Sequence, residues 1–514
     1  MVLKTFVNEP EIVWGKEEIE KLQKELDYVK KQFNTNYPLF ISDKKIMTKE
    51  KKASINPSNH EEVVGYVSQA DKAHINDAIK AAEDSFQVWS TKTFTERAQY
   101  IEKIGHLVRE KKLELTAWLI YESGKNKNEA EGEINEAIDF IEMYAQEARK
   151  LDDGATLIAM DGIKNEMIYL PLGVGVIIPP WNFPLAILLG LTVSAIVTGN
   201  TVLVKPSSST PVIGAKFMEI TREAGLPNGV INFVPGSSSK IGNYMVSHRD
   251  VSFISFTGSM QAALQIDELA HQQVPNQRFV KRVVAEMGGK GGIVVDETAN
   301  LDRAADAIVN SAFGYQGQKC SAGSRAIIHE EVYEALIDKI IERTKTLSIG
   351  PSIDDTFIGP VIDESAYEKI TSYIEIGKKE SSLIYGGKAD KQTGYFIEPT
   401  IFIDAKPSSN LMQEEIFGPV LSISKVKNYQ EGIDVYNNTN YGLTGAFFTE
   451  SDERKANAHK TMVCGNLFIN GKCTGAVVGV QPFGGYYMSG TGSKIGTHEF
   501  LMNFVHSKTI SENL

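Results

Sequence analysis

Residues 313–325 read FGYQGQKCSAGSR, and this stretch organises the interpretation of the whole chain. Three glycines and several small polar residues surround one cysteine, Cys320. Glycine allows positive φ angles and close approach of the backbone, so the stretch predicts a turn that presents a side chain. Lys319 and Arg325 add positive charge nearby, which would favour the thiolate over the thiol. A buried structural cysteine is the common role of a free thiol, so this window alone leaves both roles open.

Length and composition indicate a globular protein of about two or three domains. The chain has 514 residues, more than a single hydrophobic core normally organises. Its hydrophobic content is 42% and its charged content is 23%, both ordinary values. The net charge of −12 argues against a nucleic-acid or anionic-membrane partner.

The sequence shows no sign of secretion or membrane insertion, and we expect a cytoplasmic protein. No basic region followed by an apolar core opens the sequence, and the most apolar stretch, 184–197, is too short to span a bilayer. The cysteines form no disulfide framework, which suits a reducing compartment. Cys464 and Cys473 have no further ligand at metal spacing, so we expect structural thiols there and no metal site.

The first third of the chain combines a helix, a strand-rich segment and a run of further helices. A narrow apolar stripe over residues 16–32 predicts an amphipathic helix that docks on the body of the protein. The stripe consists of Ile19, Leu22, Leu26 and Val29. Residues 37–67 look strand-rich, and residues 76–149 contain good helix formers in succession.

From Met167 onward the chain alternates between short apolar strands and helices. The first strands are expected at residues 174–178, 201–205, 230–234 and 251–256, and a second alternating section at residues 282–483. Repeated units of this length predict a parallel sheet with helices on both faces. Ligands of such sheets bind beyond the carboxyl ends of the strands. Residues 499–509 read as a terminal strand that could pair with another subunit.

Three residues can be assembled into one chemistry. Cys320 is the candidate nucleophile. Glu286 follows an apolar strand and precedes two glycines, so its carboxylate could reach a cleft as a general base. Asn182 stands at another strand end, where its carboxamide could donate to a developing oxyanion. Taken singly, Glu286 also fits a surface ion pair and Asn182 a turn residue; their co-occurrence is the informative observation.

Seven stretches of the chain resemble the aldehyde dehydrogenase superfamily, in the family's order and over nearly the whole length. They are PPWNFP (179–184), VLVKPS (202–207), SFTGS (255–259), EMGGK (286–290), GQKCSAGSR (317–325), QEEIFGPV (413–420) and QPFGG (481–485). The resemblance implies an α/β fold with a Rossmann-type cofactor domain, an α/β catalytic domain and a small β oligomerisation element. No GxGxxG fingerprint follows a strand, which agrees with the variant nucleotide fold of this family.

The resemblance also implies domain boundaries. Residues 1–150 and 172–287 would form the dinucleotide-binding domain with its N-terminal helical extension. Residues 288–487 would form the catalytic domain. Residues 151–171 and 488–514 would form the oligomerisation element of a homo-oligomer, a dimer or a multiple of dimers.

The same resemblance assigns site residues. Catalytic roles fall to Cys320, Glu286 and Asn182. Residues matched to NAD contacts are Ile178, Pro179, Trp181, Lys205, Ser208, Gly242, Ser259, Glu415 and Phe417. Residues matched to substrate contacts are Ser321, Gly475, Ala476, Phe183 and Phe483. Many NAD-preferring members carry a carboxylate where this chain has Ser208, and a serine would not repel a 2′-phosphate, so we expect NAD use with measurable NADP use.

Within the family, the chain is most similar to members that oxidise L-glutamate γ-semialdehyde, formed from 1-pyrroline-5-carboxylate, in proline and arginine catabolism. Their substrate is an aldehyde that carries an amino-acid carboxylate. The implied mechanism runs through a cysteine thiohemiacetal and a thioester, which water then hydrolyses to give L-glutamate.

Four other interpretations compete with this one. The chain could oxidise another semialdehyde or a neutral, betaine-type aldehyde. It could be a CoA-acylating member, although that chemistry needs no hydrolytic base and Glu286 is present. It could be a catalytically dead binding protein of the same fold, which the intact Cys320, Glu286 and Asn182 disfavour. A thiol hydrolase would need a histidine partner, and the matched motifs contain none.

Overall fold

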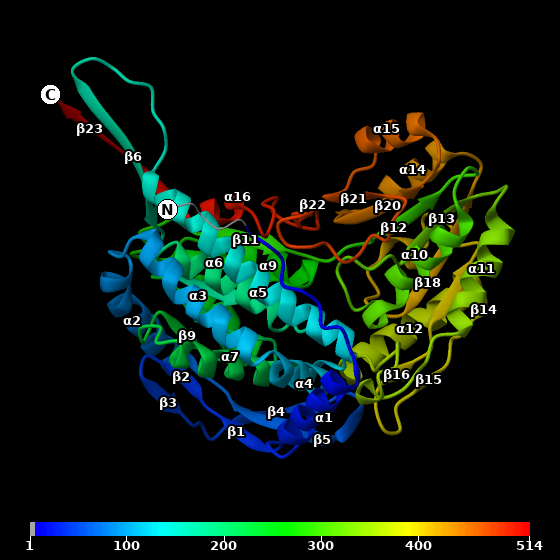
Figure 1. Cartoon of the computed structure of the whole chain (residues 1–514), viewed down its shortest axis with the longest axis horizontal. Helices are drawn as coiled ribbons and strands as arrows, with labels where there is room; N and C mark the ends of the chain where they lie inside the picture. The colour runs from blue at the N-terminus through cyan, green and yellow to red at the C-terminus, as the bar shows by residue number, and fades with distance from the viewer. Residues whose placement is uncertain (1–5) are drawn as a thin grey trace.

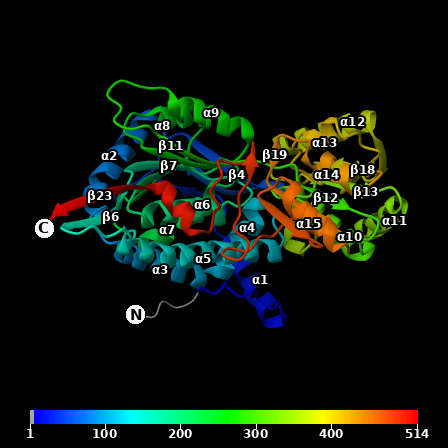
Figure 2. The same cartoon turned by 90° about the horizontal axis from the view of Figure 1, so that it is seen from above.

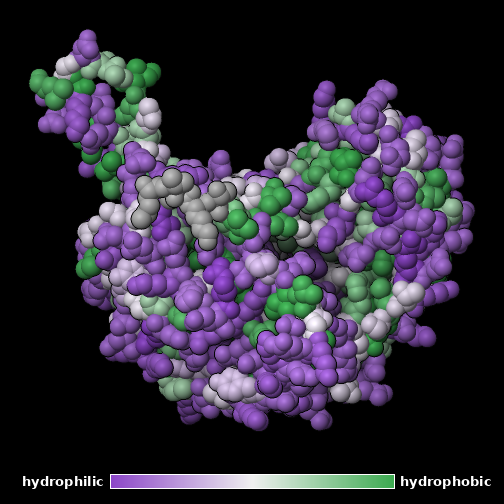
Figure 3. Space-filling view, in the orientation of Figure 1, coloured by the Kyte–Doolittle hydropathy of each residue, from purple (hydrophilic) through white to green (hydrophobic). Residues whose placement is uncertain are grey.

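Two seven-stranded sheets, each packed between helices, form two lobes that lie side by side (Figures 1 and 2). The structure is a computed structural model and describes residues 6–514. Between the lobes the molecular surface is hollowed, and both apolar and polar side chains surround the hollow (Figure 3). No helix within the described range is long and apolar enough to cross a membrane.

The first sheet is parallel over five strands. In spatial order its strands are β11 (Arg282–Glu286), β10 (Phe253–Thr257), β7 (Val174–Ile178), β8 (Thr201–Val204), β9 (Ile231–Phe233), β2 (Leu39–Ile41) and β3 (Lys44–Ile46). Strands β2 and β3 are antiparallel to their neighbours. Because the other five strands run the same way, their carboxyl ends meet at one edge of the sheet.

Helices cover both faces of this sheet because successive side chains of a buried strand point to opposite faces. In β8, Val202 and Val204 belong to the core that includes helices α5 and α6, whereas Leu203 faces the core that includes α2 and α8. The helices of this lobe are α1 (Lys16–Lys30), α2 (Lys72–Trp89), α3 (Phe94–Glu110), α4 (Lys112–Ser123), α5 (Lys127–Arg149), α6 (Ala186–Val197), α7 (Pro211–Glu223), α8 (Asn243–Ser247) and α9 (Met260–His271). The predicted layering is therefore confirmed.

The second sheet forms the other lobe. Its order is β14 (Ser382–Tyr385), β17 (Thr400–Ile403), β18 (Val420–Val426), β13 (Arg325–His329), β12 (Gly292–Val295), β20 (Thr444–Phe448) and β21 (Asn466–Ile469). Only β14 is antiparallel. Its helices are α10 (Leu301–Phe313), α11 (Tyr333–Lys345), α12 (Glu364–Glu380), α13 (Asn410–Gln413), α14 (Tyr429–Asn437) and α15 (Asp452–Thr461). Ile293 and Val295 of β12 pack toward α10 and α11, and Val294 packs toward α14.

Smaller elements complete the chain. Strands β1 (Thr35–Tyr37), β5 (Asn59–Ser68) and β4 (Lys51–Asn56) form a three-stranded sheet. Two-stranded pairs join β15 (Ala389–Asp390) to β16 (Phe396–Ile397), and β19 (Tyr441–Gly442) to β22 (Tyr486–Tyr487). Helix α16 spans His498–Leu501.

A long two-stranded arm projects from the first lobe (Figure 1). Strand β23 (Val505–Asn513) pairs antiparallel with β6 (Ile163–Pro171) along its whole length. The in-chain partner of the terminal strand is thus β6. The expected strand start at residue 499 is wrong, because Thr497 caps the short helix α16 and the chain stays helical to Phe504.

Two further expectations need correction, and one is confirmed. Residues 282–286 do not open the second section, because β11 pairs with β10 at the edge of the first sheet. The N-terminal helix is confirmed as α1, and Leu22, Leu26 and Val29 are buried against the body. Ile19 does not join this stripe, since it is 49% exposed.

Candidate active site

The cysteine loop reverses direction between α10 and β13. Tyr315, Gln316 and Gly317 all have positive φ angles, of 50°, 53° and 66°. A Cβ atom at position 317 would lie only 2.4 Å from the carbonyl oxygen of Gly418. The tight reversal therefore requires glycine there. Tyr315 anchors the reversal, because its hydroxyl donates to the Ser123 carbonyl at 3.0 Å. The predicted presenting turn is confirmed.

Cys320 is a half-buried free thiol whose surroundings oppose ionisation. Burial raises the pKa of the Cys320 thiol to about 12, and the nearby carboxylates of Glu415, Glu286 and Glu136 add to the rise. The expectation that Lys319 and Arg325 favour the thiolate is wrong.

The two cations next to the cysteine are engaged elsewhere. The buried guanidinium of Arg325 donates to the Lys290 carbonyl and to the Tyr436 carbonyl, each at 3.0 Å. Burial lowers the pKa of Lys319, and the negative charge of Glu129 is the largest effect that opposes this shift. The Arg325 side chain thus holds the loop in place, and the Lys319 charge interacts with Glu129.

Asn182 is tied directly to the cysteine loop. It lies just beyond the carboxyl end of β7 and is buried. Its amide nitrogen donates to the carbonyl oxygen of Gln318 at 3.0 Å, two residues before Cys320. The carboxamide is thereby held with its donor group facing the segment that carries the thiol.

Glu286 ends β11 and is enclosed by the C-terminal glycine loop. Side chains at Gly484 and Gly490 would come within 3.0 Å of its carboxylate, so both positions must stay small. Its Oε2 atom has no hydrogen-bond partner within residues 6–514. Burial raises the pKa of Glu286. Two groups oppose this rise: the Lys494 ammonium, which has the larger effect, and the Gly485 backbone N–H. An unpartnered buried oxygen of this kind is suited to hold a water molecule.

The residues matched to the cofactor meet at the same edge. The Trp181 and Phe417 rings pack edge to face, 5.4 Å between centres, across the two lobes. The Glu415 carboxylate accepts the Gly289 N–H at 2.8 Å. Lys205 is buried at the carboxyl end of β8 with no ion-pair partner in the described chain, and burial lowers the pKa of its amine to about 8. The Lys205 amine and the Glu415 carboxylate are groups that can form hydrogen bonds with the hydroxyl groups of a nucleotide ribose.

The other cofactor-matched residues follow strand ends of the first sheet. Ile178 ends β7 and Pro179 follows it. Ser259 caps helix α9, where its hydroxyl accepts the Ala262 N–H at 3.3 Å. Gly242 ends the turn that leads into α8. Ser208 is half-buried in the loop between Lys205 and α7.

The residues matched to the substrate split into two groups. Ser321 lies beside the 473–476 segment, since the Cys473 thiol reaches the Ser321 carbonyl at 3.6 Å. Gly475 in that segment is exposed with a φ of 75°, and Ala476 follows it. Phe183 packs edge to face on Tyr315 at 6.4 Å, whereas Phe483 packs on the first-lobe core. Within residues 6–514, Phe183 therefore contacts the cysteine loop, whereas Phe483 makes no ring contact with Phe183.

Sequence reasoning missed the charged residues that α5 and the loop before it bring to the site. Lys125 and Glu133 form a buried ion pair, and the Lys125 amine lies 4.0 Å from the Phe183 ring centre. The Glu133 carboxylate also accepts the Leu185 N–H at 2.7 Å. Glu136 adds to the electrostatic field at Cys320, and burial raises the pKa of its own carboxyl to about 7. Ordinary helical charge patterns gave no signal for any of them.

The comparisons with known proteins agree with this geometry. The model of the aldehyde dehydrogenase family matches residues 45–510. A curated relative from Geobacillus thermodenitrificans, named 1-pyrroline-5-carboxylate dehydrogenase, is 48% identical over 488 residues, covering 95% of each protein. One from Bacillus subtilis, named 1-pyrroline-5-carboxylate dehydrogenase 2, is 48% identical over 495 residues, covering 96% of each.

Solved structures lead to the same family. The crystal structure of 1-pyrroline-5-carboxylate dehydrogenase from Thermus with bound NAD superposes with a TM-score of 0.99 and 43% identity, covering 100% of both chains. Betaine aldehyde dehydrogenase from Staphylococcus aureus in complex with NAD+ superposes with a TM-score of 0.89 and 29% identity, covering 96% of this chain and 97% of that one.

Proposed function

The chain belongs to the aldehyde dehydrogenase family, and on that premise we propose that it oxidises L-glutamate γ-semialdehyde, formed from 1-pyrroline-5-carboxylate, to L-glutamate with NAD. Two observations support the chemistry: the Asn182 amide donates to the Gln318 carbonyl, two residues before Cys320, and the Glu286 carboxylate lies near enough to raise the pKa of the Cys320 thiol. The full-length relatives named for this substrate support the choice of aldehyde.

In the proposed mechanism each residue has one task. The Cys320 thiolate attacks the aldehyde carbon and forms a thiohemiacetal, whose oxyanion accepts from the Asn182 amide and the Cys320 backbone N–H. Bound NAD would supply the hydride acceptor, and the positive charge of its ring would favour the Cys320 thiolate that the carboxylates oppose. Glu286 then takes a proton from water as the water attacks the thioester and releases the carboxylate product and the thiol.

Recognition of the amino-acid end would use the segment beside Cys320. The Ser321 hydroxyl makes no hydrogen bond within residues 6–514, so it is available to a carboxylate. The backbone N–H groups of Gly475 and Ala476 would complete the anion site. The Lys472 amine lies nearby, 3.3 Å from the point where a Cβ atom would stand at Gly475. Glu136, whose charge acts on Cys320, would face the substrate ammonium.

The cofactor and aliphatic contacts follow from the same arrangement. Lys205 and Glu415 would hold ribose hydroxyls, and Ser259 the pyrophosphate at the start of α9. Phe183 and Phe483 would flank the aliphatic chain of the substrate. Ile178, Pro179, Trp181, Ser208, Gly242 and Phe417 would form the surrounding walls.

The deciding experiment compares aldehydes. NAD reduction is measured with 1-pyrroline-5-carboxylate and with a panel of neutral aldehydes, including betaine-type ones, in the wild type, Cys320→Ala and Ser321→Ala. We expect no turnover in Cys320→Ala. Ser321→Ala should raise KM for the semialdehyde by about tenfold, the loss of one charge-assisted hydrogen bond, and leave neutral aldehydes unchanged. Equal effects of Ser321→Ala on both classes would favour a neutral-aldehyde enzyme, and a CoA requirement would favour an acylating one.

The arm carries our proposal for assembly. Leu170 of β6 and Ile510 of β23 are 40% and 38% exposed, on the same face of the ladder. We propose that this face packs on a second copy of the chain, with residues 151–171 and 488–514 as the oligomerisation element. Residues 1–150 with 172–287 would form the cofactor domain and residues 288–487 the catalytic domain. Three free thiols support a cytoplasmic enzyme.

A further inference from the structure

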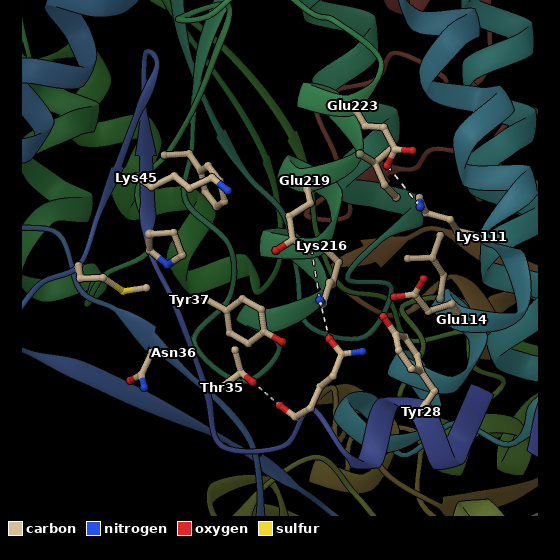
Figure 4. A pocket seen from close by; sticks show the side chains of 16 residues that line it. Tyr28, Thr35, Asn36, Tyr37, Lys45, Lys111, Glu114, Lys216, Glu219 and Glu223 are labelled. Carbon is tan, nitrogen blue, oxygen red and sulfur yellow. Dashed lines mark hydrogen bonds and ion pairs between the residues drawn. The ribbon is translucent and has the colours of Figure 1, made fainter. Parts of the chain in front are cut away.

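A second cavity lies on the first lobe, between helix α1, strands β1 to β3 and helices α4 and α7 (Figure 4). Its volume is about 560 Å³, within the range of ~300–1,000 Å³ that small-molecule sites occupy. Tyr28 and Met47, which are 51% and 56% exposed, form part of its rim. None of the residues assigned to the aldehyde or the cofactor lines this cavity.

The cavity wall is strongly charged, yet its charges balance. The charged lining residues are Lys45, Lys111, Lys216, Glu114, Glu219 and Glu223. Equal numbers of opposite charges oppose a ligand of large net charge of either sign. They favour a ligand that carries one group of each sign.

Two of these six charges are left without an ion-pair partner in the described chain. Lys111 pairs with Glu223, and Lys216 pairs with Glu219, each at 3.3 Å. The Lys45 amine contacts only the face of an aromatic ring, 5.8 Å from the Phe40 centre. The Glu114 carboxylate accepts only the Trp118 indole N–H, at 3.3 Å. One cation and one anion therefore remain available to a ligand.

Two buried polar groups on the wall also lack partners. Tyr37 is 2% exposed, and its hydroxyl makes no hydrogen bond within residues 6–514. The Gln32 amide oxygen accepts from the Lys216 amine at 3.3 Å, which leaves the amide nitrogen unpartnered. Figure 4 shows the Tyr37 hydroxyl directed toward the Lys216 amine and the amide that it contacts. Buried donors without acceptors are costly, and a ligand carboxylate would satisfy both.

We propose that this cavity binds a zwitterionic amino acid. Its carboxylate accepts from the Gln32 amide and the Tyr37 hydroxyl on the side of Lys45, and its ammonium faces Glu114. Leu115 and the other apolar lining side chains pack on an aliphatic side chain. This site is separate from the proposed aldehyde oxidation and does not depend on it.

The probe is L-leucine, titrated into the full-length protein by calorimetry. Its two single-charge analogues, isocaproate without the ammonium and isoamylamine without the carboxylate, serve as matched ligands. We expect saturable binding of one L-leucine per chain and affinities at least about tenfold weaker for both analogues, because each loses one charge-assisted contact. No saturable binding of L-leucine, or equal binding of an analogue, overturns the proposal.

Variants locate the bound probe. Lys45→Met and Glu114→Gln should each weaken L-leucine binding about tenfold or more, and Tyr37→Phe should weaken it measurably. Lys44→Met is the matched control, because Lys44 precedes Lys45 on β3 and does not line the cavity; it should leave the affinity within about twofold. Unchanged affinity in both charge variants would place the probe elsewhere and refute the site. All four variants should keep aldehyde oxidation, which separates this test from that of the proposed function.

Discussion

Lys494 links the general base to the loop that encloses it. Its amine donates to the carbonyl oxygens of Gly484 at 2.5 Å and Gly465 at 2.6 Å, while its charge opposes the raised pKa of Glu286. Gly484 itself packs against the Glu286 carboxylate. A single ammonium thus holds the loop that encloses Glu286 and also opposes the rise in the pKa of that carboxyl.

Replacing that ammonium should shift the pH dependence of turnover. Lys494→Met removes the charge that lowers the pKa of Glu286, so the pKa rises further and less base is ionised at pH 7. We expect kcat at pH 7 to fall about tenfold, one pKa unit, and to recover as the pH rises. Lys494→Arg keeps the charge and should retain most of the activity. Met and Arg variants with the same pH profile would contradict this role for the charge.

Ser208 is the residue through which we expect NADP to be accepted. A carboxylate at this position would repel a 2′-phosphate, whereas serine carries no charge. The wild type should therefore turn over with NADP as well as NAD. Ser208→Glu should lower kcat/KM for NADP at least about tenfold and change the value for NAD little, since like charges placed close together oppose binding. An equal effect on both cofactors would contradict the assignment.

At the scale of elements, one buried acid joins three parts of the first lobe. Glu122 at the end of α4 accepts the Val212 and Ile213 N–H groups at 2.7 and 2.8 Å, at the start of α7. It also accepts the Ser54 hydroxyl of β4 at 2.7 Å. It thereby caps α7 from another helix, just after the loop that carries Lys205 and Ser208.

This cap should make stability depend on pH. Burial raises the pKa of Glu122 to about 7 from an ordinary 4.5, so between these values the folded state binds more protons than the unfolded state. The free energy of unfolding should then fall by up to about 3 kcal/mol as pH rises from ~4.5 to ~7. In Glu122→Gln this contribution should vanish, as measured by urea unfolding at several pH values. The exposed Glu61→Gln should keep the wild-type slope, and an unchanged slope in Glu122→Gln would refute the prediction.

At the scale of the whole molecule, the arm exposes apolar side chains that the rest of the chain does not cover. Leu170 stands opposite His506, and Ile510 stands opposite Glu166, so both apolar side chains share one face of the ladder. A two-stranded ladder is marginally stable when isolated in water. Packing of that face on a second copy would stabilise the arm.

Charges on that face should change the assembly. The double variant Leu170→Glu/Ile510→Glu would bury two carboxylates in the proposed interface, which is unfavourable. The mass of the assembly measured by light scattering should therefore fall. Thr509→Glu places the charge on the opposite face of β23 and should leave the mass unchanged. An unchanged mass in the double variant would exclude this face as the interface.

Local sequence was sufficient wherever a short apolar run or a turn determined the structure. Strand β7 has the predicted boundaries, because a β-branched run between Gly173 and Pro179 specifies a buried strand within a few residues. The turn around Cys320 followed from its glycines for the same reason. The matched motifs likewise identified the family and the candidate reacting residues.

Long-range packing decided the rest. Arg325 and Lys319 lie close to Cys320 in sequence, but the Arg325 guanidinium donates to the Lys290 and Tyr436 carbonyls, and the Lys319 charge interacts with Glu129. The groups that do act on the thiol, Glu136 and Glu415, come from distant elements. The partner of β23 and the exposure of Ile19 were also set in the folded chain. Sequence spacing fixes which residues share a strand or a turn, whereas electrostatic neighbours and buried faces depend on contacts between segments hundreds of residues apart.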